Sequence, residues 1–367
     1  MTVGYETTAV VYRGPQSVAV ESIQIPGPGP GEMLLRVAMC GVCGSDVSEY
    51  MKGPLQAHIS SEAHRITGHS GPVVLGHEFS GHVVETGPGV DFAPGTLVAC
   101  AGGVACGECR FCRQGRGNLC EQYHIVGMQR HGGLSSYCTV PARACIDAGA
   151  LHATPSTAAL AQPMAIAVHA LGRADLAADA RIAVIGVGGI GAFLTYAAVE
   201  SGANTTAIDI ADERMTLARN LGAAAVVAAG ELRAQIGPGS FDAVFEASGT
   251  AAGLETAMDL AGRGGRLMLV GVQAPERGIS PRRVVFDEME VIGCVSLHPP
   301  DNLSEAVRVL STRREGWADV APVAFPLESV VSEGLTPEAA GRRIKSLFAP
   351  GIDQMIDTAT ADELLSA

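Results

Sequence analysis

Two patterns of hydrophobic and polar residues divide the chain. In the first 150 residues, short apolar segments such as TAVVYRG, EMLLRVAMC and GTLVACA are separated by turn-forming residues, including the break PGPGPGE. This pattern predicts short β-strands. From about Ala180 onward, apolar strands alternate with alanine-rich helical segments, as in RIAVIG followed by GAFLTYAAVESG. That alternation predicts βαβ units on a parallel sheet.

The pattern changes again after Leu297, where NLSEAVRVLSTRR predicts a helix followed by mixed short elements. The chain has 367 residues and is 47% hydrophobic, which is enough for two cores. Its formal net charge of -13 argues against nucleic acid and anionic membrane surfaces as partners. We see no signal-peptide pattern, and no apolar run approaches the ~18 residues of a membrane helix. We therefore expect a cytoplasmic protein without a disulfide framework.

A glycine-rich turn follows the strand RIAVIG and opens a helix. Gly186, Gly188 and Gly191 have the spacing G-x-G-x-x-G, which in this strand–turn–helix context indicates a dinucleotide site. The first glycine permits the tight turn, the second lets the backbone approach a pyrophosphate, and the third lets helix and strand pack closely. The helix N-terminus then offers N–H groups to the phosphates. The alternative is a glycine-rich turn without a ligand.

Asp209 ends the next strand, TTAIDI, about 20 residues further on, where a carboxylate can bind both ribose hydroxyls. Asp209, Asp212 and Glu213 should repel a 2′-phosphate, which favours NAD over NADP, and the nearby Arg214 moderates that preference. The predicted cofactor-binding residues are Gly186, Gly188, Gly189, Ile190, Gly191, Asp209, Arg214, Gly249, Gly271 and Val272.

Four cysteines lie within the stretch CGECRFCRQGRGNLC. Cys106, Cys109, Cys112 and Cys120 have the spacing C-x2-C-x2-C-x7-C. Four thiolates this close can surround one ion tetrahedrally and leave no open position, as structural zinc sites do. We therefore predict a structural zinc in a lobe at about residues 100–122, with structural disulfides or idle cysteines as the alternatives.

A second candidate set is spread over two motifs, CGVCGSD and LGHEFSG. Its members are Cys43, Ser45, Asp46, His77 and Glu78. A lone cysteine or histidine is more often a buried or surface residue than a ligand, so neither motif alone indicates a metal. Cys40 and Cys43 also form C-x-x-C, but a thioredoxin-like redox motif lies beside a βαβ unit, and this one lies in the strand-rich part.

The order of these motifs resembles the zinc-dependent medium-chain alcohol/polyol dehydrogenases. GVCGSD is followed by GHEFSG, the four-cysteine lobe, QPMAIAVHA and GVGGIG, and EYMKGPLQ through LGHEFSG is most similar to the butanediol dehydrogenase branch. The resemblance implies an α/β protein with a GroES-like, mostly-β catalytic domain (1–154 and 301–367). It also implies an inserted Rossmann domain (155–300), a doubly wound parallel sheet that binds NAD. Two Zn²⁺ per subunit, one catalytic and one structural, and a homodimer or homotetramer are implied as well.

The resemblance also implies a role for each residue of the second set. Cys43 and His77 match the catalytic zinc ligands, and Glu78 matches the neighbouring ligand or near-ligand. Asp46 matches the carboxylate that orients the histidine, and Ser45 matches the hydroxyl that takes the proton from the alcohol. Zinc would act as a Lewis acid on the alcohol oxygen while hydride passes to the nicotinamide.

Two positions depart from the family pattern. Gln162 stands where many relatives carry a glutamate, although some sugar-dehydrogenase relatives carry glutamine there. It is a candidate zinc ligand, and the alternative is a helix-start residue that never approaches the metal. Ser48 stands where the polyol branch often has a histidine that extends the proton relay. His58, His64 or His69 could replace that histidine from the following loop, unless they are solvated loop residues.

The remaining cysteines are interpreted as small buried hydrophobic residues: Cys40, Cys100, Cys138, Cys145 and Cys294. The sequence thus predicts an oxidoreductase that transfers hydride between NAD and a secondary alcohol or vicinal diol, such as 2,3-butanediol and acetoin. One alternative is a sugar, polyol or cyclitol dehydrogenase, which Gln162 favours. The other is a non-catalytic nucleotide-binding relative, against which the intact metal-site residues argue. The expected partner is a small-molecule alcohol or ketone, with no nucleic acid and no membrane.

Overall fold

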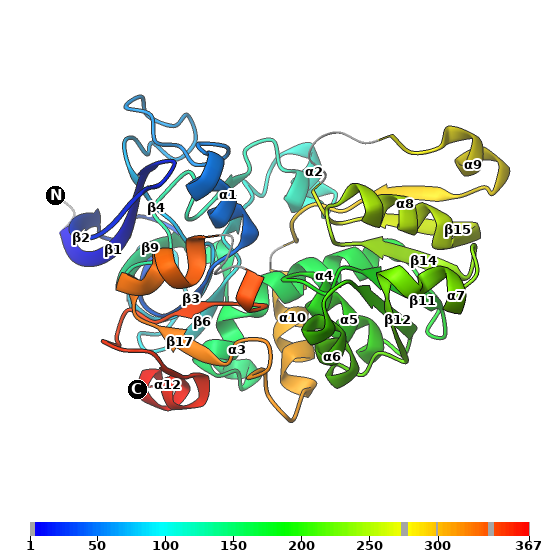
Figure 1. Cartoon of the computed structure of the whole chain (residues 1–367). Helices are drawn as coiled ribbons and strands as arrows, with labels where there is room; N and C mark the ends of the chain where they lie inside the picture. Colours follow the sequence, from blue (N-terminus) through cyan, green and yellow to red (C-terminus); the bar gives the residue numbers. More distant parts are fainter. Residues whose placement is uncertain (1–3, 273–277, 299, 337–340, 367) are drawn as a thin grey trace. The chain divides into compact units, whose positions relative to one another are not determined.

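The computed structural model describes residues 4–272, 278–298, 300–336 and 341–366 (Figure 1). The chain divides into two compact units: unit 1 comprises Met1–Ala165 and Leu297–Ala367, and unit 2 comprises Ile166–Ser296. The predicted domain boundaries, after residues 154 and 300, lie within about ten residues of these limits. The helix α3 (Pro155–Ala159) contacts strands of unit 1.

Unit 1 is rich in β-structure, as its short apolar segments predict. Its strands are β1 (Gly4–Gly14), β2 (Ser17–Pro26), β3 (Glu32–Gly41), β4 (Val73–Val74), β5 (Glu78–Thr86), β6 (Leu97–Cys100), β7 (Gly103–Val104), β8 (His124–Ile125), β9 (Tyr137–Pro141), β10 (Cys145–Asp147), β17 (Val323–Phe325), β18 (Leu347–Phe348) and β19 (Ile356–Asp357). Within the described residues they form the sheets β2-β1-β4, β7-β8 and β10-β6-β5-β3-β18-β17-β19, in which β9 also pairs with β3.

The helical elements of unit 1 are short. They are α1 (Gly44–Lys52), α2 (Arg110–Arg113), α3, α10 (Asp301–Thr312), α12 (Thr358–Leu365) and the turns η1 (Gly117–Leu119), η2 (Ala142–Ala144), η3 (Gly149–Leu151), η5 (Leu327–Ser329) and η6 (Val331–Leu335). The helix α4 (Ala161–Ala174) begins in unit 1 and ends in unit 2. The predicted helix NLSEAVRVLSTRR is α10, whose buried face is Leu303, Ala306, Val307 and Leu310.

The strand β3 occupies the middle of the large sheet of unit 1. It is paired with β5, β9 and β18, and most of its residues are buried. Its last residue, Gly41, lies opposite Glu78 on β5 and opposite Leu347 on β18. The register therefore brings three sequence-distant segments together at one end of β3, just before Cys43.

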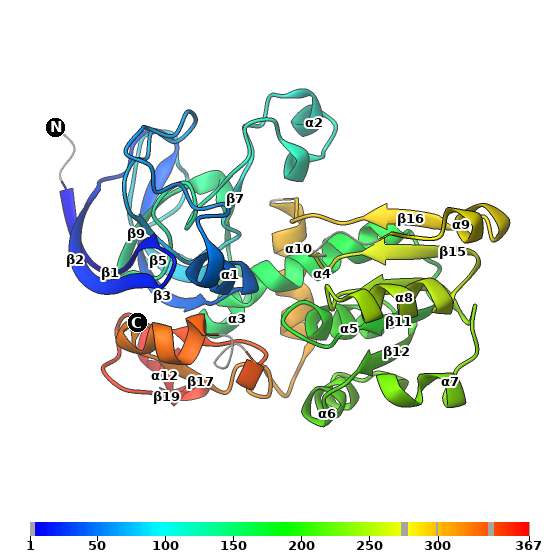
Figure 2. The ribbon, with the colours of Figure 1, turned by 45° about the horizontal axis from the view of Figure 1, so that its top comes forward.

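Unit 2 contains the predicted parallel sheet. Its elements are β11 (Arg181–Ile185), α5 (Gly191–Glu200), β12 (Asn204–Asp209), α6 (Asp212–Asn220), β13 (Ala225–Ala228), η4 (Ala229–Glu231), α7 (Leu232–Gln235), β14 (Phe241–Glu246), α8 (Ala251–Leu260), β15 (Ala261–Leu269), α9 (Pro281–Phe286) and β16 (Glu290–Gly293). In the described part the strand order is β13-β12-β11-β14-β15-β16, and every adjacent pair is parallel. Figure 2 shows β15 and β16 side by side at one edge. This is a doubly wound Rossmann order, with its switch point between β11 and β14.

Local composition explains where the elements of unit 2 end. The helix α8 stops at Leu260, and β15 begins at Ala261, earlier than the apolar segment RLMLVGV indicates. Glycines in AGRGG are poor helix residues, so the chain extends there instead. The core on one side of the sheet combines strand residues such as Val244 with Leu254 and Met258 of α8.

No described helix is both long enough and apolar enough to cross a membrane. All ten cysteines are free thiols. Cys40, Cys100, Cys138 and Cys145 are buried as predicted. The prediction was wrong for Cys294, which is only partly buried because it directly follows the edge strand β16.

Candidate active site

A group of three potential metal ligands lies at the end of β3. Cys43 directly precedes α1, and His77 and Glu78 stand at the start of β5. One ligand atom from each residue lies within 4.8 Å of the others. His77 and Glu78 are buried and Cys43 is partly buried. The pairing of Gly41 with Glu78 is what joins the two sequence motifs.

Each ring nitrogen of His77 faces a polar side chain of α1. Ser45 Oγ lies 3.2 Å from Nε2, and Asp46 Oδ1 lies 3.4 Å from Nδ1. Asp46 is itself fixed, because its Oδ2 accepts a hydrogen bond of 2.9 Å from the Cys43 N–H. Burial opposes a charged imidazole, but Asp46 and Cys43 raise the pKa of His77 well above its usual value.

Asp46 Oδ1 and His77 Nδ1 face each other at 3.4 Å, and neither makes a hydrogen bond among the described residues. Gln162 Oε1, on α4, is also buried without a hydrogen-bond partner there. Buried polar atoms are usually hydrogen-bonded, so the ligand histidine and its carboxylate fit a site arranged for an additional group. A metal on Nε2 would leave the Nδ1 proton facing Asp46, the usual arrangement behind a metal-bound histidine. Thiolate, imidazole and carboxylate donors suit zinc, so these residues fit the implied catalytic ion.

A lysine that no sequence motif singles out lies beside this group. Lys345 Nζ donates to both oxygens of Glu78, at 2.8 and 2.6 Å. Burial lowers the pKa of Lys345, but the Glu78 carboxylate more than offsets this and leaves it above its ordinary value. The two residues are 267 positions apart. The only trace in the sequence is a single lysine before the apolar residues of RRIKSLFAP.

The residues considered for an extended proton relay lie apart from this group. Ser48 is exposed, and its hydroxyl donates to the Gly44 carbonyl at 2.9 Å. The loop histidines pack against one another and against His131, with ring centroids 5.1 Å apart for His58 and His64 and 4.9 Å for His69 and His131. Within the described chain, none of them joins the ligand group of Cys43. They are partly buried rather than fully solvated.

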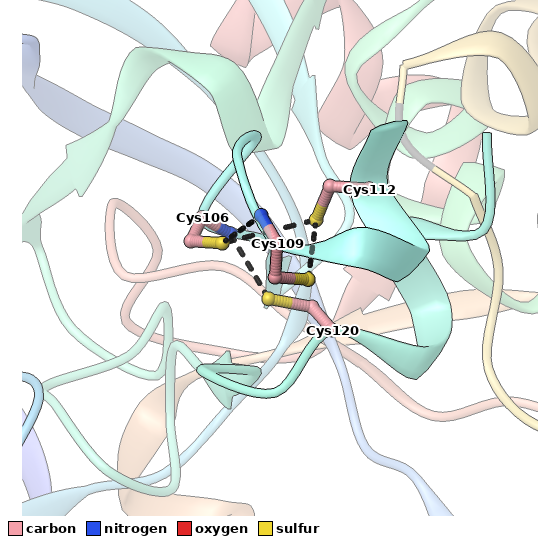
Figure 3. A group of neighbouring side chains, drawn as sticks. All are labelled: Cys106, Cys109, Cys112 and Cys120. Carbon is pink, nitrogen blue, oxygen red and sulfur yellow. Dashed lines mark hydrogen bonds between the residues drawn. The ribbon is translucent and has the colours of Figure 1, made fainter. Parts of the chain in front are cut away.

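The four cysteines of the lobe converge on one point (Figure 3). Their sulfur atoms all lie within 4.8 Å of one another. Backbone N–H groups of Cys109 and Gln122 donate to Cys106 Sγ and Cys120 Sγ, both at 3.3 Å. Similar N–H donors, first that of Cys112, lower the pKa of Cys109 to about 6, whereas burial raises the pKa of Cys112 to about 12 and also raises that of Cys120. Donors that stabilise thiolates around a shared centre fit a tetrahedral structural zinc.

The glycine turn of unit 2 has the geometry that a dinucleotide needs. Gly186 has a φ of +87°, and a Cβ at Gly191 would collide with the Gly186 carbonyl oxygen. At Gly188, by contrast, the only atom within 4 Å of an added Cβ would be Arg214 Nη1, at 4.0 Å. The N-cap residue of α5, Ile190, makes no side-chain cap hydrogen bond. The turn is therefore closed toward its own helix and open where a pyrophosphate would approach.

A cavity of about 380 Å³ adjoins this turn. Of the predicted cofactor residues, its described lining includes Gly186, Gly188, Gly189, Asp209 and Arg214. The others lie outside that lining: Ile190, Gly191, Gly249, Gly271 and Val272. Ile190 and Gly191 instead form the start of α5, and Val272 is 90% exposed.

The Asp209 carboxylate forms hydrogen bonds with the backbone of the cavity wall. It accepts hydrogen bonds from the backbone N–H groups of Val187, Ile210 and Ala211, at 2.6, 2.7 and 3.0 Å. Asp209 is 5% exposed. The sequence predicts a ribose-binding role for this carboxylate, and the structure adds a second role, because Asp209 links β12 to the glycine turn.

Comparison with known proteins agrees with this geometry. The family profile "Alcohol dehydrogenase GroES-like domain" matches residues 29–150, and "Zinc-binding dehydrogenase" matches residues 189–312. The (R,R)-butanediol dehydrogenase of Bacillus subtilis is 30% identical over 351 residues, covering 92% of this chain and 96% of that protein. The sorbitol dehydrogenase of the same organism is 28% identical over 303 residues, covering 80% and 83%.

Solved structures show the same fold. A protein from Sinorhizobium meliloti 1021 assigned as a zinc-binding dehydrogenase, crystallised with NADP, has a TM-score of 0.83 at 29% identity, covering 94% of this chain and 100% of that chain. The match to butanediol dehydrogenase spans nearly the whole chain and includes both units. The chain therefore belongs to the zinc-dependent medium-chain alcohol dehydrogenase family and is an oxidoreductase of that family.

Proposed function

We propose that this protein is an NAD-dependent zinc dehydrogenase that interconverts a secondary alcohol or vicinal diol, of the 2,3-butanediol and acetoin type, with its ketone. The observation that carries the proposal is the arrangement around His77. Its Nε2 side faces the Ser45 hydroxyl at 3.2 Å, and its ligand atom lies within 4.8 Å of those of Cys43 and Glu78. Metal ligands and a proton acceptor thus share one site.

The residues of this site have separate tasks in the proposed reaction. Bound zinc would supply Lewis-acid polarisation of the substrate oxygen. Ser45 would relay the proton of the alcohol, accepting it while its own hydroxyl proton passes to solvent and the hydride leaves for the nicotinamide, because its partly exposed hydroxyl lies beside the ligand group. Asp46 would keep the imidazole in one orientation, since it is fixed to the Cys43 N–H and faces Nδ1.

Two further features support the proposed cofactors. The buried Asp209 carboxylate at the cavity would favour the ribose diol of NAD over a 2′-phosphate. Arg214 lines the same cavity, and a related structure holds NADP, so the preference for NAD is a matter of degree. The four-cysteine lobe would hold a second, structural zinc.

The second candidate is a sugar, polyol or cyclitol dehydrogenase. It is supported by the relationship to a sorbitol dehydrogenase and by Gln162, the amide that stands where many relatives have a carboxylate. Both candidates use the same metal site and differ in the substrate that they accept.

A metal analysis and a substrate screen test the proposal. We expect two zinc ions per subunit, and NAD reduction that is faster with vicinal diols than with polyols, sugars or simple alcohols. We also expect a homodimer or homotetramer by light scattering. Faster turnover of polyols would favour the second candidate, and no NAD reduction with any alcohol would contradict both.

The role of Ser45 has a matched control in the same helix. Ser45→Ala should lower turnover by ~100- to 10,000-fold, the usual contribution of a general acid–base step. Ser48→Ala should leave turnover near that of the wild type, because Ser48 is exposed and its hydroxyl is bonded to the Gly44 carbonyl. Equal effects of the two substitutions would contradict the proposed proton path.

A further inference from the structure

A polar cavity of about 390 Å³ lies within unit 1. Its lining includes His69 from the loop after α1, Arg130 and His131 from the segment after β8, and Glu32 at the start of β3. None of these residues belongs to either group of potential metal ligands. Small-molecule sites have volumes of ~300–1,000 Å³ and a few convergent polar groups, so the cavity has the dimensions of such a site.

Backbone groups fix the tautomers of the two imidazoles in this lining. His69 Nε2 lies 3.2 Å from the Gly71 carbonyl oxygen, which can only accept, so this nitrogen carries the proton. His131 Nδ1 accepts from the Val74 N–H at 3.2 Å, so the proton of His131 is on Nε2. One ring therefore keeps an acceptor, His69 Nδ1, and the other keeps a donor, the Nε2–H of His131.

Both imidazoles are neutral and close together. Burial lowers the pKa of His69, and it lowers the pKa of His131 to about 4, so neither ring is charged at neutral pH. Their ring centroids are 4.9 Å apart, at an interplanar angle of 75°. No residue that the structure describes forms a hydrogen bond with His69 Nδ1 or His131 Nε2. A donor and an acceptor without protein partners thus lie side by side at one cavity.

The charged residues of the lining favour a ligand without net charge. Arg130 Nη2 lies 2.7 Å from Glu32 Oε1, so the two side chains form an ion pair. An anion would meet the Glu32 carboxylate and the lone pair of His69 Nδ1, whereas a cation would meet the guanidinium group and the N–H of His131. A hydroxyl group both donates and accepts, so neighbouring hydroxyls can satisfy the two rings without either repulsion.

We propose that this cavity is a binding site for a neutral polyhydroxylated compound, a polyol or a sugar, separate from the metal group. One hydroxyl would donate to His69 Nδ1, and a neighbouring hydroxyl would accept from the Nε2–H of His131. The ion pair of Arg130 and Glu32 would offer further donors and acceptors to the same ligand. The site does not depend on the proposed metal or on the proposed substrate.

Two substitutions remove the free ring nitrogens and keep the hydrogen bonds of the loop. In His131→Asn, the amide oxygen replaces Nδ1 as the acceptor for Val74, but the donor to the ligand is lost. In His69→Gln, the amide N–H replaces Nε2–H as the donor to Gly71, but the acceptor is lost. His58→Gln is the matched control, because the Nε2 of His58 also faces a backbone carbonyl, at 2.8 Å, and His58 is not among the residues that line the cavity.

The probe is D-sorbitol, and the readout is the NMR signals of isotope-labelled histidines, assigned from these three variants. In the wild type, sorbitol should shift the signals of His69 and His131 to saturation and leave that of His58 in place. His131→Asn and His69→Gln should each raise the Kd ~2- to 10-fold, as expected when one neutral hydrogen bond is lost. The remaining cavity histidine reports the Kd in each variant, and His58→Gln should leave it unchanged.

Two charged relatives of glucose test the chemical class of the ligand. Gluconate and glucosamine should bind more weakly than glucose, because each brings one charge to a lining that contains both signs. The proposal is overturned if sorbitol and glucose leave both cavity signals unshifted, if the charged compounds bind as tightly as glucose, or if both isosteric variants keep the wild-type Kd. Failure of the proposed function would appear separately, as an absence of NAD reduction with any alcohol.

Discussion

Replacing Gly191 by alanine measures how tightly the cofactor turn packs against α5. The new Cβ would lie well under 3.0 Å from the Gly186 carbonyl oxygen, which is a backbone atom and cannot rotate away. Overpacking of this kind costs ~1–3 kcal/mol, and the better helix propensity of alanine returns up to ~1 kcal/mol. Gly191 is the first residue of α5, so little of that return applies, and the expected net loss of about 1–3 kcal/mol corresponds to a fall in Tm of roughly 2–12 °C.

Gly188→Ala is the matched control, because the same methyl group meets open space. Its only neighbour within 4 Å would be Arg214 Nη1, at 4.0 Å. Stability should change by no more than ~0.5 kcal/mol. The methyl group should instead obstruct the approach of the pyrophosphate, and losing one charge-assisted hydrogen bond of ~1.5–3 kcal/mol weakens binding by roughly 10- to 100-fold.

The assay combines thermal unfolding of the cofactor-free protein with NADH binding by fluorescence. Gly191→Ala should lose stability, and Gly188→Ala should lose affinity with little change in Tm. The reasoning is refuted if Gly191→Ala melts like the wild type, or if Gly188→Ala loses as much stability as Gly191→Ala does.

Four other predictions concern single side chains. Cys112→Ser should lose one zinc per subunit and lower the Tm, because structural zinc sites carry ~10–16 kcal/mol of binding energy; unchanged zinc content and Tm would argue against a metal in the lobe. Asp209→Ala should weaken NAD and narrow its advantage over NADP in kcat/KM, and a wild type that prefers NADP would contradict this role. Gln162→Glu should make the active-site zinc harder to remove with chelator, whereas identical zinc loss would show that residue 162 does not contact the metal. Burial lowers the pKa of His131 to about 4, below its unfolded value of about 6.5. Stability should therefore fall as pH drops from about 6.5 to 4, less steeply in His131→Asn, and equal slopes would contradict this.

The sequence by itself determined the features that depend only on residues close to one another in the chain. The spacing of Cys106 through Cys120 is enough to indicate one ion, because four sulfurs in a short loop can reach a common centre. Gly186, Gly188 and Gly191 likewise need only the strand before them and the helix after them to form the turn. The alternation of strands and helices in unit 2 was predicted for the same reason, since each element reflects its own periodicity.

The tertiary structure decided which distant side chains meet. Strand register alone places Lys345 against Glu78 across 267 positions, and no spacing in the sequence encodes that contact. The same holds for Asp209, whose carboxylate is engaged by the Val187 N–H only because β11 and β12 are adjacent in the sheet. The burial of a side chain is also set by the fold and not by its neighbours in sequence. Gln162 Oε1, for example, is buried and has no hydrogen-bond partner among the described residues. The local sequence determines which chemical groups a segment carries. Sheet pairing and packing determine which groups those side chains contact and how far they are exposed to solvent.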